Sequence, residues 1–374
     1  GVEVVLFPEL SVTGYTCGDL FLQPALLAAA EQALAELLRR TAELNTAFVV
    51  GLPVAVDDML YNCAVVAAAG EVLGVVPKCH IPDYAEFYES RWFASGQGRP
   101  TVEIELCGQS VPFGPDLLFD IGGARCAVEI CEDLWVPAPP STEMALAGAT
   151  VILNPSASDE IIGKADYRRS LISNQSARLY CAYAYADASE GESTTDMVFA
   201  GENLVYENGS KLAATKLLTC DMAIADVDLD RLVAERRRST TWTRADDAPE
   251  AVTVEFSFEG SLAEEPVLRD ALGIDRVFPR APFVPVDHGD LAERCETILD
   301  LQTAGLKTRL AHTGTKAAVI GLSGGLDSTL ALLVTVRSMH WGCRALVSQP
   351  CPCPASARRI APSRMPSRSL ATWV

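Results

Sequence analysis

A cysteine at the end of a strand-like segment is the first residue in this sequence that could do chemistry. Residues 124–135 read ARCAVEICEDLW, in which short β-type residues alternate up to Cys131 and acidic residues follow at once. The alternation predicts a strand that ends at Cys131, and open α/β sheets carry their active sites at strand ends. A cysteine in an apolar stretch is more often an inert core residue, and neighbouring carboxylates disfavour the thiolate. Cys131 alone therefore does not indicate an active site.

Two charged residues upstream of Cys131 also follow strand-like segments. Glu9 lies just past the nearly continuous apolar residues 1–7, and Lys78 comes directly after the apolar residues 72–77. A thioester mechanism needs a nucleophile, a base that takes its proton, and a cation or amide that stabilises the oxyanion. We expect a neutral thiol at rest, with Glu9 as general base and Lys78 as the oxyanion group. A chain of this length also places such residues at strand ends by chance, so the set alone does not decide the function.

A glycine turn near the end of the sequence is the second candidate site. The apolar residues 317–322 predict a strand, residues 323–329 read SGGLDST, and a helical spacing of leucines follows. Such a turn presents backbone N–H groups and a helix N-terminus, which favour a bound phosphate. Because the turn lacks the lysine of a Walker loop, the sequence argues against a P-loop NTPase.

The elements that would position these residues alternate between strands and helices. The spacing of apolar residues predicts a helix at 24–44. Short apolar runs separated by glycine turns predict strands and hairpins. The expected strands cover residues 47–54, 61–69, 72–77, 117–121, 125–130, 150–154 and 181–186, with a helix at 165–179 before the last of them, and then short strands at 196–228 and a helix at 231–244. This order predicts an α/β fold that contains antiparallel hairpins.

Composition divides the rest of the chain into three parts. Residues 245–285 are rich in Asp, Glu and Pro and poor in periodicity, which predicts a long linker with local structure. A further domain is expected at 286–348, with a helix at 290–312 ahead of the glycine turn. Residues 349–374 hold four Arg and no acidic residue, so we expect a disordered tail or an aberrant, out-of-frame end. Because the sequence opens without Met inside an apolar strand, we also expect truncation at the N-terminus.

The overall composition argues against several classes of function. A formal net charge of −19 disfavours nucleic acid and anionic membranes as partners, because clustered Lys and Arg drive binding to both. No apolar run reaches the length of about 18 residues that a membrane span needs. The 12 cysteines are scattered without regular spacing, which favours a reduced, cytoplasmic compartment. The four histidines and the one tight cysteine pair predict no structural metal site.

Three stretches, FPELSVTGY at 7–15, PKCHIPDYAEFYE at 77–89 and EICEDLW at 129–135, stand in this order in the chain. Together they resemble the catalytic blocks of the nitrilase superfamily, and specifically the glutaminase domain of glutamine-dependent NAD synthetases. The resemblance covers residues 1–244 and implies a nitrilase-like (CN hydrolase) four-layer αββα sandwich. Since that fold has a strand before the first residue of this chain, the resemblance implies that the first strand is missing.

The resemblance also implies roles for individual residues. It makes Glu9 the base, Lys78 the oxyanion group and Cys131 the nucleophile, with Glu86 as a supporting carboxylate. The resemblance also implies that the glutamine substrate is bound by Tyr84, Ser158 and Lys164. Position 164 is Lys where the family usually has Arg, which keeps the positive charge and loses a bidentate contact with the substrate carboxylate.

The glycine turn resembles the loop of ATP pyrophosphatases, which implies the start of a doubly wound α/β domain at 286–348. The implied ATP-binding residues are Gly321, Leu322, Ser323, Gly324, Gly325, Leu326, Asp327 and Ser328. Within this set, Ser323 and Ser328 would contact phosphate and Asp327 would help to hold Mg²⁺.

The two resemblances together predict a glutamine-hydrolysing NAD synthase, a ligase that uses ammonia from glutamine. Its substrates would be L-glutamine, ATP with Mg²⁺, and deamido-NAD, its by-products AMP and pyrophosphate, and it would need no prosthetic group. The family forms homo-oligomers, so we expect one here. Two alternatives stay open: a stand-alone nitrilase-type amidase or carbamoylase, and an inactive fragment that acts as a binding module.

Overall fold

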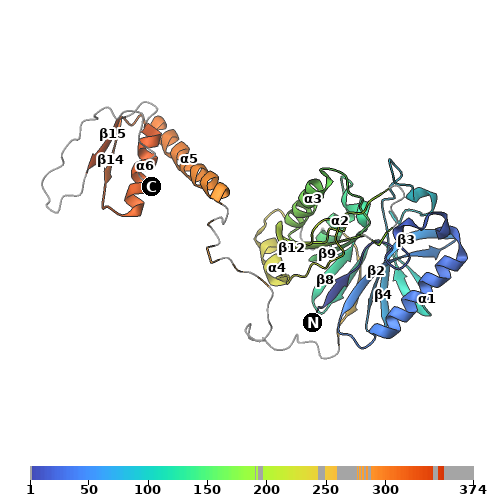
Figure 1. Cartoon of the computed structure of the whole chain (residues 1–374). Helices are drawn as coiled ribbons and strands as arrows, with labels where there is room; N and C mark the ends of the chain where they lie inside the picture. Colours follow the sequence, from blue (N-terminus) through green and yellow to red (C-terminus); the bar gives the residue numbers. More distant parts are fainter. Residues whose placement is uncertain are drawn as a thin grey trace. The chain divides into compact units, whose positions relative to one another are not determined.

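The computed structural model divides the chain into two units, residues 1–276 and residues 277–374 (Figure 1). The structure describes residues 2–189, 191–192, 197–242, 249–258, 276, 278, 280–281, 284, 288–339 and 344–348. The tail predicted at 349–374 lies outside the described residues, as does most of the segment predicted as a linker.

Two β-sheets form the centre of the first unit. The six-stranded sheet has the order β1-β2-β3-β4-β6-β5, and the seven-stranded sheet has the order β12-β11-β10-β9-β8-β7-β13. The strands of the first are β1 (Val4–Leu6), β2 (Ala47–Val56), β3 (Met59–Ala68), β4 (Glu71–Pro77), β5 (Val102–Leu106) and β6 (Gln109–Phe113). The strands of the second are β7 (Leu117–Ile121), β8 (Ala124–Val128), β9 (Val151–Ser156), β10 (Ala182–Asp187), β11 (Leu204–Glu207), β12 (Ser210–Ala214) and β13 (Val252–Phe256).

The sheets pack face to face because successive residues of each strand point to opposite faces. In β2, Val49 points into the layer between the sheets, where it joins Phe119 of β7 and Leu153 of β9. Its neighbours Phe48 and Val50 point outward. Both faces of each central strand are therefore apolar, which explains the nearly continuous apolar runs in the sequence.

Helices cover the two outer faces. Helix α1 (Pro24–Thr41) lays Leu34 and Leu38 on the six-stranded sheet. Helices α2 (Pro140–Leu146) and α3 (Lys164–Leu179) cover the seven-stranded sheet, and α4 (Leu229–Arg238) follows further along the chain. The four-layer αββα sandwich predicted from the sequence is confirmed.

One strand lies inside the segment predicted as a linker. Strand β13 pairs in parallel with β7 at the edge of the seven-stranded sheet. Arg276, the last residue of the first unit, is held within that unit by a bidentate pair between its guanidinium and Glu207 at 2.7 and 2.8 Å. The prediction of a linker over 245–285 is therefore wrong for 252–256. The five-residue alternation VTVEF is short and is surrounded by acidic residues and prolines, so its sequence pattern did not predict a strand.

The described residues of the second unit contain one strand–helix–strand repeat. Strands β14 (Ala317–Gly321) and β15 (Arg344–Ser348) pair in parallel, and α6 (Leu326–Met339) connects them. Helix α5 (His288–His312) packs on α6, where Arg337 pairs with Glu296 and Asp300 at 3.0 and 2.6 Å. The glycine turn thus lies between a strand and a helix, as the sequence predicted.

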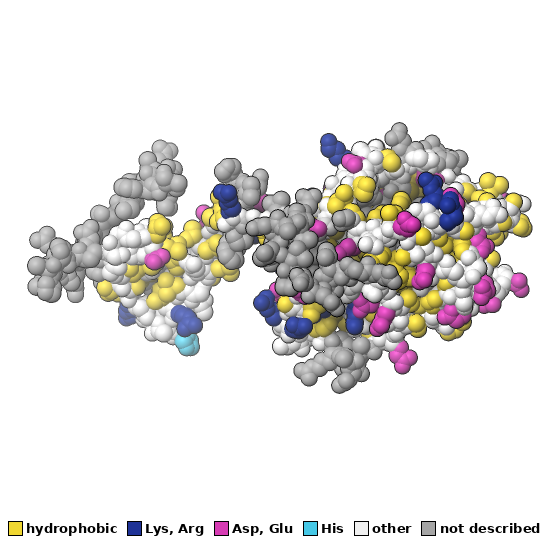
Figure 2. Space-filling model, turned by 90° about the horizontal axis from the view of Figure 1, so that it is seen from below, with side chains coloured by type: hydrophobic (Ala, Val, Ile, Leu, Met, Phe, Trp, Pro, Cys, Tyr) yellow, Lys and Arg dark blue, Asp and Glu magenta, His cyan; other side chains and the backbone are white. Residues whose placement is uncertain are grey.

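The surface and the cysteines agree with the composition. On the face shown in Figure 2, acidic side chains are spread over the first unit. The cysteines that the structure describes are all free thiols. None of the described helices is both long enough and apolar enough to cross a membrane.

Candidate active site

Glu9 is held at the junction of the two sheets. Its own N–H donates to the carbonyl of Ser156 on β9 at 3.2 Å, and the preceding Phe7 N–H donates to Val49 of β2 at 2.9 Å. The loop lies so close to β2 that a side chain at Gly51 would put a Cβ atom 2.1 Å from the backbone nitrogen of Leu10. A glycine at position 51 therefore lets the loop that carries the buried Glu9 lie directly against β2.

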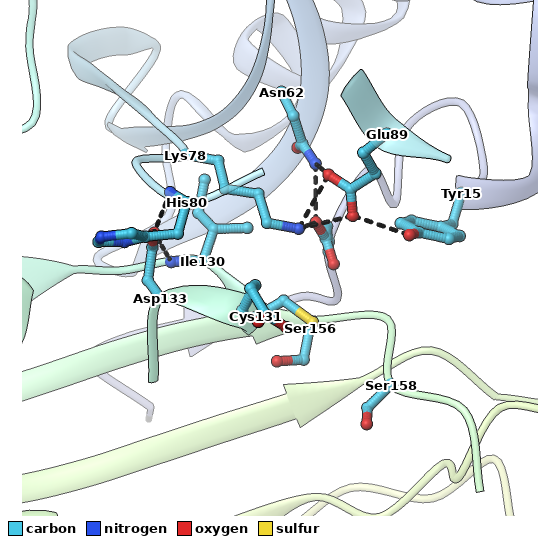
Figure 3. A network of polar contacts seen from close by, with 12 residues as sticks. Tyr15, Asn62, Lys78, His80, Glu89, Ile130, Cys131, Asp133, Ser156 and Ser158 are labelled. Atoms are coloured by element: carbon cyan, nitrogen blue, oxygen red, sulfur yellow. Dashed lines mark hydrogen bonds and ion pairs between the residues drawn. The ribbon is translucent and has the colours of Figure 1, made fainter. Parts of the chain in front are cut away.

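Lys78 lies at the centre of a buried network of charges (Figure 3). It directly follows β4, and its ammonium Nζ is 2.7 Å from Glu9 Oε1 and 2.7 and 2.9 Å from the two carboxylate oxygens of Glu89. The Lys78 side chain is fully buried. An ammonium between two carboxylates is fixed in place before any substrate arrives, which suits a group that stabilises an oxyanion.

The carboxylate that supports Lys78 is Glu89 and not the expected Glu86. Glu89 also accepts a hydrogen bond from the hydroxyl of Tyr15 at 2.8 Å. The half-buried Glu86 instead lines a surface cavity of about 180 Å³ beside Tyr88. The N–H of Glu89 donates to the carbonyl of Pro82 at 3.2 Å, and this turn directs the Glu89 side chain inward.

Burial and charge set the protonation states of this network. Burial alone would lower the pKa of Lys78, but the carboxylates of Glu89 and Glu9 raise it well above its usual value. Burial raises the pKa of Glu89 to about 7, against the opposing effect of the Lys78 charge. Burial and the negative charge of Glu9 raise the pKa of Cys131 well above its usual range, while Lys78 opposes them. A neutral resting thiol, as expected from the sequence, follows from these effects.

Glu9 keeps one oxygen free for a proton. Its Oε1 accepts hydrogen bonds from Lys78 and from Asn62 Nδ2, both at 2.7 Å. Its buried Oε2 accepts none from the residues that the structure describes. A buried carboxylate oxygen without a donor is ready to accept a proton, and the charge of Glu9 acts directly on the Cys131 thiol.

Cys131 adopts a strained backbone conformation at the start of the short helix η3 (Cys131–Leu134). Its φ is +47°, which costs a non-glycine residue about 1–3 kcal/mol. The Cys131 N–H donates to Oδ1 of the buried Asn154 on β9 at 3.1 Å, and Asn154 Nδ2 donates to the hydroxyl of Tyr183 at 2.9 Å. Asn154 thus holds the nucleophile in its turn from the seven-stranded sheet.

The residues expected to bind glutamine are arranged beside η3. The exposed Tyr84 donates its hydroxyl to both carboxylate oxygens of Glu132, at 3.0 Å each. Lys164 pairs with Asp159, and its ammonium lies 5.3 Å from the centre of the Trp135 ring. The Lys164 cation is therefore partly neutralised, and Glu132 adds a carboxylate that the sequence analysis did not include.

Ser158, the third expected substrate residue, lies two positions beyond the end of β9. Its N–H donates to Asp187 Oδ1 at 2.7 Å, and its hydroxyl donates to the carbonyl of Asp159 at 3.4 Å. Burial raises the pKa of Asp187 to about 8, against its hydrogen bond from Ser158. Ser158 is thus fixed by its backbone, while its hydroxyl has only one long contact.

The glycine turn of the second unit is exposed and is held by local hydrogen bonds. The hydroxyls of Ser323 and Ser328 are 3.2 Å apart, and Ser328 also donates to the carbonyl of Gly325 at 3.0 Å. Gly324 has a φ of +84°, which only glycine adopts readily. Asp327 lies in the first turn of α6. No group of three or more His, Cys, Asp or Glu that could hold a metal occurs among the described residues.

Comparisons with known proteins agree with this geometry. A family model described as carbon-nitrogen hydrolase matches residues 1–237. The glutamine-dependent NAD(+) synthetase of Mycobacterium tuberculosis is 44% identical over 345 residues, which cover 91% of this chain and 50% of that protein. The chain spans about half the length of the curated relatives it matches. These relatives confirm the resemblance seen in the three sequence stretches.

Two solved structures share the fold. The glutamine-dependent NAD(+) synthetase of Cytophaga hutchinsonii has a TM-score of 0.54 at 23% identity and covers 91% of this chain and 46% of its own. The enzyme of the same name from Acinetobacter baumannii, in complex with adenosine diphosphate, has a TM-score of 0.50 at 23% identity. The match covers 93% of this chain and 52% of that one. With its αββα sandwich, its Glu9–Lys78–Cys131 site and the family match over most of the first unit, this chain belongs to the carbon-nitrogen hydrolase family.

Proposed function

We propose that this chain hydrolyses the side-chain amide of L-glutamine through a thioester on Cys131. The observation that carries the proposal is the buried network in which Lys78 is fixed between Glu9 and Glu89 while Glu9 Oε2 has no donor. A base, a cation and a neutral thiol are the groups that this chemistry requires.

The reaction has two halves that use the same groups. Glu9 takes the proton of the Cys131 thiol as the sulfur attacks the amide carbon, and the oxyanion of the tetrahedral intermediate develops beside Lys78 Nζ. When the C–N bond breaks, Glu9 returns the proton to the leaving nitrogen, which departs as ammonia. Water then attacks the γ-glutamyl thioester while Glu9 takes a proton from the water. Collapse of the intermediate breaks the C–S bond, Glu9 returns the proton to the Cys131 sulfur, and glutamate leaves.

Charges beside η3 support an amino acid as the substrate. Glu132 directly follows the nucleophile and offers a carboxylate to an α-ammonium group, with Tyr84 on its other side. Lys164 offers a cation to an α-carboxylate, and Ser158 offers a hydroxyl. The relatives' names specify glutamine. Since Lys164 is shared with Asp159, we expect weaker binding of the carboxylate than an Arg would provide.

For the second unit, we propose that the turn at 321–328 binds ATP, with Mg²⁺ near Asp327, and that the released ammonia converts deamido-NAD to NAD. One carboxylate is a suitable protein ligand, because Mg²⁺ usually keeps several waters and binds to substrate phosphates. Mg²⁺ would neutralise phosphate charge, and the backbone N–H groups of the turn would orient the phosphates. The relative from Acinetobacter baumannii was solved with a bound adenine nucleotide. The whole protein would then be a carbon–nitrogen ligase that releases AMP and pyrophosphate.

We also propose a homo-oligomer in the cytoplasm. The free thiols of the described cysteines fit a reducing compartment.

Incubation of the protein with L-glutamine tests the first proposal. Equal amounts of ammonia and glutamate are expected, and the Cys131→Ala variant provides the blank. Parallel reactions with asparagine and with simple amides separate a glutaminase from a general amidase. If these amides are hydrolysed and glutamine is not, the assignment of the substrate is wrong.

A further inference from the structure

One buried carboxylate, that of Asp133, is bonded to both loops that carry the reacting groups. Its Oδ2 accepts hydrogen bonds from the N–H groups of Ile130 at 2.9 Å and of Cys79 at 3.3 Å. Its Oδ1 accepts from the N–H of His80 at 2.7 Å and lies 2.9 Å from Nδ1 of the same histidine. Figure 3 shows Asp133 between His80 and Ile130. The Asp133 side chain is 2% exposed, so these contacts replace water around the carboxylate.

The contacts of Asp133 join segments from different sheets. Ile130 directly precedes Cys131 and follows β8 of the seven-stranded sheet, whereas Cys79 and His80 directly follow Lys78 after β4 of the six-stranded sheet. The bond to Ile130 is an ordinary cap at the start of η3. Capping does not account for the three other contacts, all of which are made with the loop that carries Lys78.

We propose that Asp133 is a positioning residue that fixes the Cys131 thiol relative to Lys78 and Glu9. The proposal rests on the thioester chemistry proposed above. Transfer of the thiol proton and stabilisation of the oxyanion both depend on the distances between these groups. A displacement of about 1 Å costs up to about 100-fold in rate. One side chain that accepts from both loops is a direct way to hold those distances.

The substitution Asp133→Asn separates positioning from charge. The amide has the same shape, but one of its two atoms donates hydrogen bonds instead of accepting them. Replacement of Oδ2 leaves the N–H groups of Ile130 and Cys79 without their acceptor, and replacement of Oδ1 does the same to the N–H of His80. In either case the loop that carries Lys78 loses a bond to residue 133, and we expect the reacting groups to shift relative to one another. The effect of charge has the opposite sign, because loss of a carboxylate near Cys131 favours the thiolate and would speed its reactions.

The experiment compares the parent protein with Asp133→Asn and with Asp120→Asn as a matched control. Asp120 also accepts a backbone N–H, that of Gly123 at 3.0 Å, but it does so at the turn that leads into the other end of β8. Two rates are measured: glutamine hydrolysis, as kcat and KM, and alkylation of Cys131 by iodoacetamide, followed by peptide mass spectrometry. For Asp133→Asn we expect kcat to fall at least about tenfold with KM within about twofold, and slower alkylation. Asp120→Asn should change none of these values by more than about twofold.

A combination with Glu9→Gln tests whether Asp133 acts through the base. Once Glu9 can no longer take the proton, the position of Cys131 relative to it matters less. The double variant is therefore expected to alkylate at nearly the rate of Glu9→Gln alone. If the two substitutions slow alkylation independently, so that their factors multiply in the double variant, the proposal is overturned. It is also overturned if Asp133→Asn is alkylated as fast as the parent or faster.

Two further measures keep the outcome decisive. Near-ultraviolet circular dichroism checks folding, and Asp133→Glu replaces Asp133→Asn if the latter does not fold, since it keeps the charge and moves the carboxylate by one methylene. A smaller loss in the same direction is expected, and unchanged rates in Asp133→Glu would overturn the proposal. If the parent releases no ammonia from glutamine, the proposed function fails, whereas the alkylation rates still decide the role of Asp133.

Discussion

The Cys131 site of the first unit and the glycine turn of the second are built in opposite ways. The first is buried, and side chains distant in sequence hold it, such as Glu9 and Glu89 on either side of the Lys78 ammonium. The second is exposed, and its contacts join residues no more than five positions apart, such as Ser323 and Ser328. A buried site depends on the packing of a whole domain, whereas a local turn depends on its own backbone. The two sites should therefore respond differently to substitution, which the following predictions test.

The largest effect is expected from Cys131→Ala. Hydrolysis of glutamine should fall below detection, because no other group in the site can form the acyl intermediate. ATP binding at the glycine turn should be unchanged. An assay of released ammonia measures the loss, and a glutamine-like electrophile followed by mass spectrometry should label Cys131. Cys126→Ala, at a buried cysteine in the same hairpin, is the control and should keep its activity. Labelling of another cysteine with Cys131 left free would refute the assignment.

Lys78→Met is expected to reduce kcat for glutamine by at least about 100-fold, since it removes the cation beside the oxyanion. The fold should persist, because the buried Glu89, whose pKa burial raises to about 7, can take up a proton in place of the lost charge. Steady-state kinetics and thermal unfolding measure both effects. Lys211→Met, on the exposed side of β12, is the control. Undiminished turnover in Lys78→Met would remove Lys78 from the mechanism.

The buried Glu129 tests how the burial of a carboxylate changes the stability of the first unit with pH. Its carboxylate accepts from the Tyr183 hydroxyl and from the Ser141 N–H, and burial raises its pKa to about 7. The folded state binds the proton more tightly than the unfolded state, so stability is lost as pH rises from about 4.5 through about 7, by up to about 3 kcal/mol. Glu129→Gln should lack this loss and become more stable than the parent as pH rises.

Denaturant unfolding of the parent and Glu129→Gln at several pH values measures this difference. The exposed Glu105 on β5 supplies the control variant Glu105→Gln, which should follow the parent. A constant difference between the parent and Glu129→Gln from pH 5 to pH 8 would show that Glu129 does not titrate in this window.

The smallest effect is expected from Gly324→Ala in the second unit. The positive φ of Gly324 is unfavourable for alanine by about 1 kcal/mol, so affinity for ATP should fall about fivefold. Glutamine hydrolysis should not change. Isothermal calorimetry with ATP and Mg²⁺ measures the shift, and Gly305→Ala, in open space on α5, is the control. Equal affinities for the parent and Gly324→Ala would argue against a role for this turn in binding.

The same contrast explains what the sequence could predict. Cys131, Lys78 and Glu9 each follow a strand, so a local pattern exposed them as candidates, and the glycine turn could be read for the same reason. Glu89 was missed in favour of Glu86 because both lie in one short block without helical or strand periodicity, and the path of the loop, in which the Glu89 N–H bonds to the Pro82 carbonyl, is not visible in the sequence. Asp133 and Asn154 were missed because their partners lie 53 and 23 positions away. Strand β13 was missed because its neighbours are polar, whereas its pairing with β7 supplies the apolar environment.

The bond between Asn154 and the Cys131 N–H has a consequence for inhibitor design. In many hydrolases a reversible aldehyde or ketone inhibitor gains affinity when its oxyanion accepts a hydrogen bond from the amide of the nucleophilic residue. That amide is already occupied here, at 3.1 Å from Asn154 Oδ1. An adduct on Cys131 would have to place its negative oxygen toward the Lys78 ammonium instead. Selective compounds for this chain should therefore be built around a cation contact, and those optimised for an amide-lined oxyanion hole should bind poorly.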